Sequence, residues 1–188
     1  ADIAFLSEHL PARLAGREVL EVACGTGYWT QHLAKTAARL VATDGTAEPL
    51  AFARLRPGTG EVTFLQADAY ALPAGLGELG AAFAGLWFSH VPIAAQAAFL
   101  ASLHARLRAG ARVILIDNNE AQLRDFPITE TDADGNTWQQ RALPDGSSHR
   151  VLKNFPTEAA MRALLAPMAR SFHFQQLGNF WLCEYELA

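Results

Sequence analysis

The chain has 188 residues, of which 51% are hydrophobic and 18% are charged, and its formal net charge at pH 7 is −4. This length and apolar content predict one domain, spanning residues 1–188, with a sizeable core. The acidic balance, without any run of Lys or Arg, disfavours a nucleic-acid partner, and the apolar segments are too short and too interrupted to cross a bilayer.

Apolar runs typical of buried strands alternate with helical patterns along the first 117 residues. Strands are predicted at 17–23, 39–44, 61–68, 81–88 and 111–117, and helices at 28–38, 47–55 and 93–109. The last of these helices is expected to end at Gly110, as a glycine in the C′ position. This alternation implies right-handed crossovers and a mostly parallel sheet covered on both faces, with its ligand beyond the carboxyl ends of the strands.

Residues 119–155 form a polar, turn-rich segment inserted after the fifth strand. Within it, 136–143 and 148–155 flank Pro144–Ser147, a pattern that predicts a β-hairpin. An insertion of this length is usually either a functional lid or a disordered loop, and aromatic and basic residues such as Trp138 argue against pure disorder. We therefore expect an ordered lid.

The C-terminal part returns to regular structure. A helix is predicted over 157–169, with Thr157 as its N-cap. The segments 171–177 and 180–187 flank Gly178-Asn179 and predict a closing antiparallel hairpin. The two cysteines, Cys24 and Cys183, fall in separate predicted strands. They suggest a reducing, cytoplasmic location, and no signal-peptide pattern opens the chain.

The segment Glu21–Gly27, EVACGTG, joins the first strand to the first helix. Such a turn brings backbone N–H groups close to a bound cofactor, and Asp44 ends the next strand, where a carboxylate can accept from both hydroxyls of a ribose. A dinucleotide fingerprint requires a third glycine, but Thr30 stands there. An acid at Glu21 suits a cofactor with a positive amino group better than one with phosphates. The pattern predicts an adenosine-containing cofactor.

With three later segments, this motif resembles the class I S-adenosylmethionine-dependent methyltransferases of the small-molecule type, over nearly the whole chain. The later segments are Asp68-Ala69 in FLQADAYALP, LWFSHV at 86–91 and LHARLRAGARVILID at 103–117. The chain departs from the family pattern at Ala23, where the first glycine of the motif is usual, and at Gly80, where many members carry an acid. Alanine is small enough to leave the turn plausible.

The resemblance implies an α/β fold: a doubly wound, mostly parallel seven-stranded Rossmann-like sheet with a closing antiparallel hairpin and an inserted hairpin after the fifth strand. It also implies S-adenosylmethionine (SAM) as methyl donor and S-adenosylhomocysteine (SAH) as product. Asp68 is expected to accept from the adenine amino group, the Ala69 N–H to meet a ring nitrogen, and Glu21 to act indirectly on the cofactor's amino group. The expected cofactor-binding residues are Glu21, Ala23, Gly25, Thr26, Gly27, Tyr28, Asp44, Gly45, Asp68, Ala69 and Leu86. Alternatively, Asp44 and Asp68 are helix caps.

Three residues are expected to act in catalysis: His90, Trp87 and Arg141. In the family, the place of Trp87 lies between the cofactor's methionine end and the acceptor, and an aromatic face attracts a sulfonium; the alternative is core packing, expected for one of Trp87 and Phe88. His90 is either a general base or a structural residue. Arg141 either binds an acidic substrate group or is a surface cation. No motif with metal-ligand spacing is present, so no metal is expected.

The expected function is methyl transfer from SAM to an unidentified small-molecule acceptor by in-line displacement. Two alternatives remain open. One is a non-catalytic or regulatory module that binds the cofactor. The other is a nicotinamide-dependent oxidoreductase of similar architecture, which Thr30 disfavours because it replaces the third glycine of the dinucleotide fingerprint. The sequence leaves the oligomeric state open.

Overall fold

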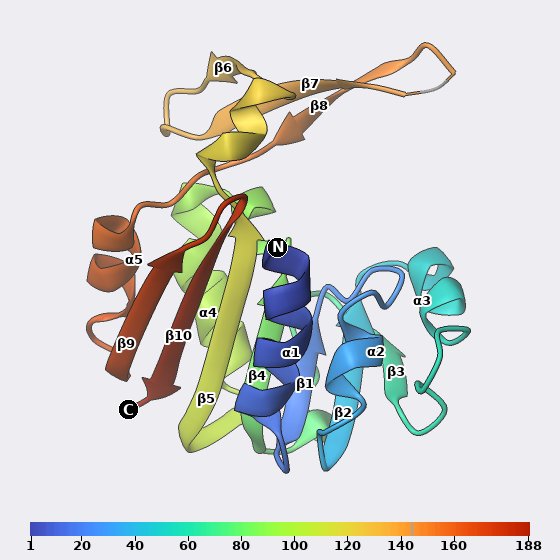
Figure 1. The fold of residues 1–188 in the computed structure, drawn as a ribbon. Coiled ribbons are helices and arrows are strands. Elements are labelled where there is room, and N and C mark those ends of the chain that lie inside the picture. Colours follow the sequence, from blue (N-terminus) through green and yellow to red (C-terminus); the bar gives the residue numbers. More distant parts are fainter. Residues whose placement is uncertain (144) are drawn as a thin grey trace.

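Seven strands form one mixed sheet in the order β3-β2-β1-β4-β5-β10-β9 (Figure 1) in the computed structural model, which describes residues 1–143 and 145–188. The first five strands run parallel, and β10 is antiparallel to both of its neighbours. The strands are β1 (Glu18–Val22), β2 (Arg39–Asp44), β3 (Thr63–Gln66), β4 (Leu79–Gly85), β5 (Leu107–Asn118), β9 (Ala169–Gln176) and β10 (Phe180–Leu187). The strand order reverses between β1 and β4, where a doubly wound sheet places its ligand.

Helices cover both faces of the sheet. They are α1 (Asp2–Leu14), α2 (Thr30–Leu33), α3 (Ala47–Ala53), α4 (Gln96–His104) and α5 (Glu158–Leu165), with short 3₁₀ helices η1 (Ala74–Leu76), η2 (Phe88–His90), η3 (Ile93–Ala95) and η4 (Glu120–Arg124). Thr157 caps α5 as predicted, since its Oγ1 accepts from the Ala160 N–H at 3.2 Å. Among the described residues, no helix combines the length and hydrophobicity needed to span a bilayer.

Two large apolar clusters form most of the core, one on each face of the sheet, and a small third cluster contains Cys24, Ala42 and Leu50. Leu6 of α1 and Leu33 of α2 belong to one cluster, and Phe99 of α4 and Met161 of α5 belong to the other. Neighbouring residues of β5 alternate between the clusters, because successive side chains of a strand point to opposite faces. The central strands are therefore buried on both sides, as the continuous apolar runs of the sequence predict.

The prediction of a helix over 93–109 ending at Gly110 was wrong. The helical part ends at His104, and β5 begins at Leu107. Gly110 lies inside β5 with φ +75°, at an irregularity where the register against β4 shifts. The apolar spacing around Leu103 and Leu107 fits a helix, but tertiary pairing of Leu107 with Leu79 overrides that preference. The first predicted helix is also shorter than expected, because regular structure in α2 is confined to Thr30–Leu33.

The inserted segment folds into a three-stranded antiparallel sheet, β6 (Ile128–Thr131), β7 (Thr137–Ala142) and β8 (Ser148–Leu152). The predicted hairpin is β7–β8, whereas β6 was not predicted. The predicted turn includes Pro144, which lies outside the described residues. The inserted sheet stands above the carboxyl ends of the parallel strands (Figure 1). This position is suited to a cover over a ligand site.

Candidate cofactor and acceptor site

A cavity of about 760 Å³ lies at the carboxyl ends of β1, β2, β3 and β4, around the point where the strand order reverses. Its lining residues are Ala23, Asp44, Gly45, Thr46, Gln66, Ala67, Asp68, Ala69, Leu86 and Trp87. Seven of these were predicted as site residues. Thr46, Gln66 and Ala67 were not, although each lies within two residues of a predicted strand-end acid, Asp44 or Asp68.

The turn after β1 depends on unusual backbone conformations. Ala23, Gly25 and Gly27 have φ angles of +55°, +54° and +77°. A Cβ on Gly27 would lie 2.9 Å from both Cα and Cβ of Ala53, so only glycine allows the turn to pack against α3. Ala23 adopts the left-handed conformation without being glycine, as does Leu86 at +59°. Each costs about 1–2 kcal/mol, and strain of this kind concentrates at ligand sites.

Asp44 ties the glycine turn to β2. Its Oδ2 accepts from the Gly25 N–H at 2.9 Å, and its Oδ1 accepts from the N–H and hydroxyl of Thr46, both at 3.1 Å. Asp44 is not a helix cap, because Thr46 occupies the N-cap position of α3. A carboxylate offers about four acceptor positions. Three are used here, so Oδ2 of this cavity-lining residue keeps capacity for one further donor.

Asp68 and the buried Ala69 line the same cavity beyond β3. The Oδ1 atom of Asp68 accepts from the Tyr70 N–H at 2.9 Å and closes a local turn rather than capping a helix. Tyr70 packs edge-on against Trp87, with ring centroids 6.2 Å apart. Trp87 lines the cavity, whereas Phe88 is fully buried and belongs to the core, so the two aromatic residues separate as the sequence predicts.

Glu21 lies beneath the cavity and does not line it. Its side chain is only 1% exposed, and its Oε2 has no hydrogen-bond partner among the described residues. Burial raises the pKa of this carboxyl to about 8, so most of it is protonated at pH 7. Gly25, Thr26, Gly27 and Tyr28 are likewise outside the cavity lining, and Tyr28 packs edge-on against Trp29 instead.

Three consecutive residues, 152–154, hold the inserted sheet against η2, the short helix that begins directly after the cavity-lining Trp87. The carbonyl of Leu152 accepts from His90 Nδ1 at 2.7 Å. The ammonium of Lys153 donates to Ser89 Oγ at 2.8 Å, and the Asn154 N–H donates to the Ser89 carbonyl at 2.8 Å. We call residues 152–154 the clamp. It fixes η2 to the inserted sheet through contacts that the sequence did not reveal.

A buried ion pair anchors the clamp to the end of β5. Lys153 is 1% exposed and Asp117 is 0% exposed, and Nζ lies 2.7 Å from Asp117 Oδ1. The second carboxylate oxygen accepts from the Ser89 N–H at 2.9 Å, and Nζ also donates to Asn118 Oδ1 at 3.2 Å. All the charge-bearing atoms therefore have partners, which a buried pair requires.

The hydrogen bond of His90 fixes its tautomer when the ring is neutral. A carbonyl oxygen only accepts, so Nδ1 carries the proton and Nε2 keeps its lone pair. Nε2 has no partner among the residues that the structure describes. Burial first, and then the charge of Lys153, lower the pKa of His90 below its ordinary value, while Asp117 and the Leu152 hydrogen bond oppose the shift. His90 thus presents a neutral nitrogen base near neutral pH.

Arg141 is held on the inserted sheet by neutral groups. Its Nη2 donates to Gln139 Oε1 at 2.8 Å and to Gln122 Oε1 at 3.3 Å. The guanidinium lies over the ring of Phe126, 4.4 Å from its centroid. Arg141 does not line the 760 Å³ cavity, but its charge is among those that lower the pKa of His90. Arg141 is thus partly buried and held in place on the inserted sheet, and its role stays a prediction.

Comparison with known proteins identifies the family. A family model described as a methyltransferase domain matches residues 19–110. Two solved structures of DhpI, one a complex with SAH and one a complex with SAM and HEP, are each 30% identical to this chain. The first comparison covers 100% of this chain and 85% of DhpI with a TM-score of 0.78, and the second covers 98% and 86% with a TM-score of 0.79.

The chain belongs to the class I SAM-dependent methyltransferases. The crystal structure of PH0226 from Pyrococcus horikoshii OT3, 17% identical with a TM-score of 0.81 over 100% of this chain and 90% of that one, shares the fold. No curated protein sequence matches the chain. The predicted family, fold and donor SAM are thus confirmed, and the oxidoreductase alternative has no support. The roles of individual site residues stay predictions.

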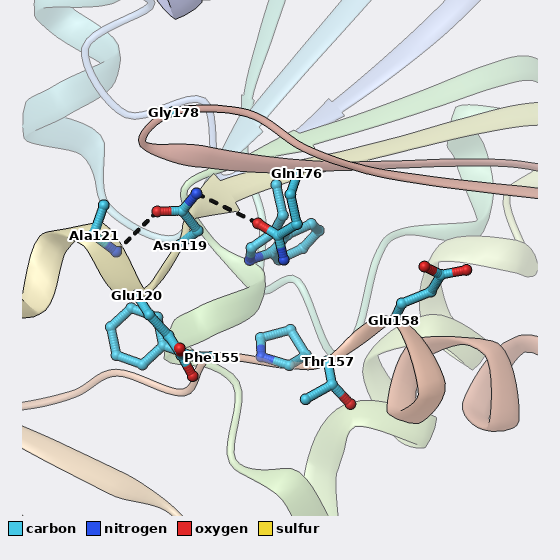
Figure 2. Close-up of a pocket in the computed structure, with 10 residues that line it drawn as sticks. Asn119, Glu120, Ala121, Phe155, Thr157, Glu158, Gln176 and Gly178 are labelled. Atoms are coloured by element: carbon cyan, nitrogen blue, oxygen red, sulfur yellow. Dashed lines mark hydrogen bonds between the residues drawn. The ribbon is translucent and has the colours of Figure 1, made fainter.

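This methyltransferase has a second cavity, of about 360 Å³, beyond the end of β5. Figure 2 shows that Asn119 bridges its walls: its Oδ1 accepts from the Ala121 N–H at 2.9 Å, and its Nδ2 donates to Gln176. Glu120, Phe155 and Thr157 also line it. This cavity shares no lining residue with the 760 Å³ cavity, so the two are separate sites on the molecule.

Proposed function

We propose that this methyltransferase methylates a small-molecule acceptor seated between η2 and the inserted sheet. The observation that carries the proposal is the clamp. It holds the inserted sheet against Ser89 and His90 of η2, two and three residues beyond the cavity-lining Trp87. A fixed cover favours a compact acceptor over a polymer that must lie in an open groove. The net charge of −4 likewise disfavours nucleic acid. Free thiols at Cys24 and Cys183 support a cytoplasmic location.

The residues around the 760 Å³ cavity fit SAM. Asp44 would hold the ribose hydroxyls with the remaining capacity of Oδ2, and Asp68 with Ala69 would hold the adenine. The buried Nε1 of Trp87 has no partner among the described residues, so a bound cofactor can satisfy a donor that the protein leaves unpaired. When bound, SAM supplies a methyl group on a positively charged sulfur, already activated for in-line displacement.

The protein then contributes alignment, exclusion of water and proton removal. Positioning of two reactants is worth several kcal/mol. The clamp and the inserted sheet supply this positioning, because they fix and cover the space between η2 and the inserted sheet where the acceptor is proposed to lie. If the acceptor atom must lose a proton, His90 Nε2 takes it, because Nδ1 is occupied by the Leu152 carbonyl. Trp87 offers an aromatic face to the positive sulfur.

The size class of the acceptor can be tested without knowing its identity. The enzyme is incubated with SAM carrying a radioactive methyl group and a cell extract, and the extract is then separated at about 3 kDa. We expect the label in the small-molecule fraction. Label recovered in protein or nucleic acid instead would contradict the proposal. A reaction with Asp44→Ala enzyme controls for other methyltransferases in the extract.

If His90 is the base, the rate of methyl transfer should depend on pH. The pKa of His90 lies below 6.5, so the neutral base dominates above that pH, and kcat/KM for the labelled acceptor should fall as the pH drops through the lowered pKa. In His90→Asn this acid limb should vanish and kcat should fall by about tenfold, a modest loss because the donor is already activated. An unchanged acid limb in the variant would show that His90 is structural. SAH affinity serves as the control and should not change.

A further inference from the structure

We infer that the acceptor carries an oxyanion group, a carboxylate or a phosphoryl group, and that Arg141 binds it. This inference rests on the proposed function, because it names the class of acceptor for the same site. The geometry that carries it is a partly buried guanidinium on the inner face of the inserted sheet, held only by amides and an aromatic ring.

The first observation is the side of β7 on which Arg141 lies. Gln139 and Arg141 are two residues apart in the strand and therefore share a face. Gln139 is 0% exposed, and its amide donates to the Phe126 carbonyl at 2.6 Å, so this face is turned toward the molecule. Gln140, which lies between Gln139 and Arg141, and Trp138, which precedes Gln139, are on the opposite face. Arg141 therefore lies on the inner face of the inserted sheet, beside Gln122 of η4 and Phe126.

The second observation is the missing counter-ion. No carboxylate among the described residues lies within ion-pair distance of Arg141, whereas the nearby Lys153 is neutralised by Asp117 at 2.7 Å. Nε of Arg141 is buried without a partner, and Nη1 has no partner among the described residues. A buried guanidinium nitrogen without an anionic partner is costly, even where the side chain as a whole is only partly buried. An anionic ligand group restores the balance.

The third observation is preorganisation. Gln122 and Gln139 both accept from Nη2, Gln122 in turn donates to Asn118 Oδ1 at 3.0 Å, and Phe126 stacks under the guanidinium at 4.4 Å. These contacts fix the plane of the guanidinium and leave Nη1 free. A planar, fixed fork is suited to the oxygens of a carboxylate or phosphoryl group. Gln122 and Lys153 both donate to Asn118 Oδ1, so the hydrogen bonds that hold Arg141 connect directly to the clamp.

Arg150 on the same hairpin provides a matched control. It lies on β8 opposite Gln140, stacks on Trp138 with its guanidinium carbon 3.5 Å from the ring centroid, and pairs with Glu130 at 2.8 Å. Arg150 is thus stacked like Arg141 but has a counter-ion and belongs to the outer face. Its loss should leave anion binding unchanged.

The test is calorimetry on SAH-loaded protein, with sodium acetate and inorganic phosphate as probes and sodium chloride to keep the ionic strength constant. We expect at least one of the two anions to bind the wild type in roughly the millimolar range. Arg141→Gln should weaken that binding by about tenfold or more, Arg141→Lys should keep part of it, and Arg150→Gln should keep all of it. The probe that binds more tightly identifies the oxyanion type.

Two results would overturn the inference: neither anion binds the SAH-loaded wild type, or Arg141→Gln binds it as well as the wild type does. SAH affinity is measured first in every variant and should be unchanged, which also shows that each variant is folded. Failure of the wild type to bind SAH would instead contradict the cofactor site, so the two failures are distinguished.

Discussion

Lys153→Met is expected to lower the free energy of unfolding by about 3–5 kcal/mol, because it leaves the fully buried carboxylate of Asp117 without its cation. The same change removes the hydrogen bond from Nζ to Ser89 Oγ. The loss is large because Asp117 is fully buried and, among the described residues, only Lys153 pairs with it. Urea denaturation followed by tryptophan fluorescence measures it.

The double variant Lys153→Met/Asp117→Asn separates an unpaired charge from lost packing. An amide at position 117 carries no charge and can still accept from the Ser89 N–H, so the double variant should be more stable than Lys153→Met alone. The contrary result is a double variant that loses as much stability as Lys153→Met and Asp117→Asn lose together when each is measured alone. That result would show that the destabilisation does not come from an uncompensated carboxylate. A loss below about 1 kcal/mol for Lys153→Met would contradict the burial of the pair.

Asp44→Ala is expected to weaken SAH binding by about 100-fold or more. A hydrogen bond to a charged group contributes about 1.5–3 kcal/mol, and in the variant the ribose would lose the acceptor that Oδ2 is proposed to supply. The substitution also frees the Gly25 and Thr46 N–H groups that the carboxylate holds, so the turn that frames the cavity loses its tie to β2. Isothermal titration calorimetry measures the change directly.

Glu48→Ala is the matched control for Asp44→Ala. Glu48 is an exposed acid in the first turn of α3, four residues from Asp44, and does not line the cavity. Removing its charge should change SAH affinity by less than about twofold, because exposed charges are screened. Equal losses in the two variants would mean that general electrostatics, rather than contact with Asp44, governs cofactor binding.

The sheet and the cavity were predictable because their signals are local. Apolar runs mark the central strands, and Asp44 and Asp68 stand directly at or after strand ends, where parallel strands bring them to one edge. The same reasoning failed at β5, because the sequence around Leu107 satisfies helical spacing as well as strand pairing. Only the register against β4 decides between the two.

The clamp and the setting of Arg141 were not predictable, because their partners are distant in the sequence. Lys153 reads as an ordinary surface cation beside β8, and nothing local shows that Asp117, 36 residues earlier, becomes its buried partner. Likewise the fixed tautomer of His90 depends on the Leu152 carbonyl, 62 residues away. Non-local hydrogen bonds of this kind depend on the docking of the inserted sheet, for which the sequence carries no periodic signal.

The central claim is that the 760 Å³ cavity at the ends of β1, β2, β3 and β4 binds the adenosyl cofactor. Calorimetric titration of the purified wild-type protein with SAH tests it most directly. We expect one binding site per chain, with an affinity that depends on Asp44. Saturable binding that is unchanged by Asp44→Ala, or no binding of SAH to the folded protein, would contradict it.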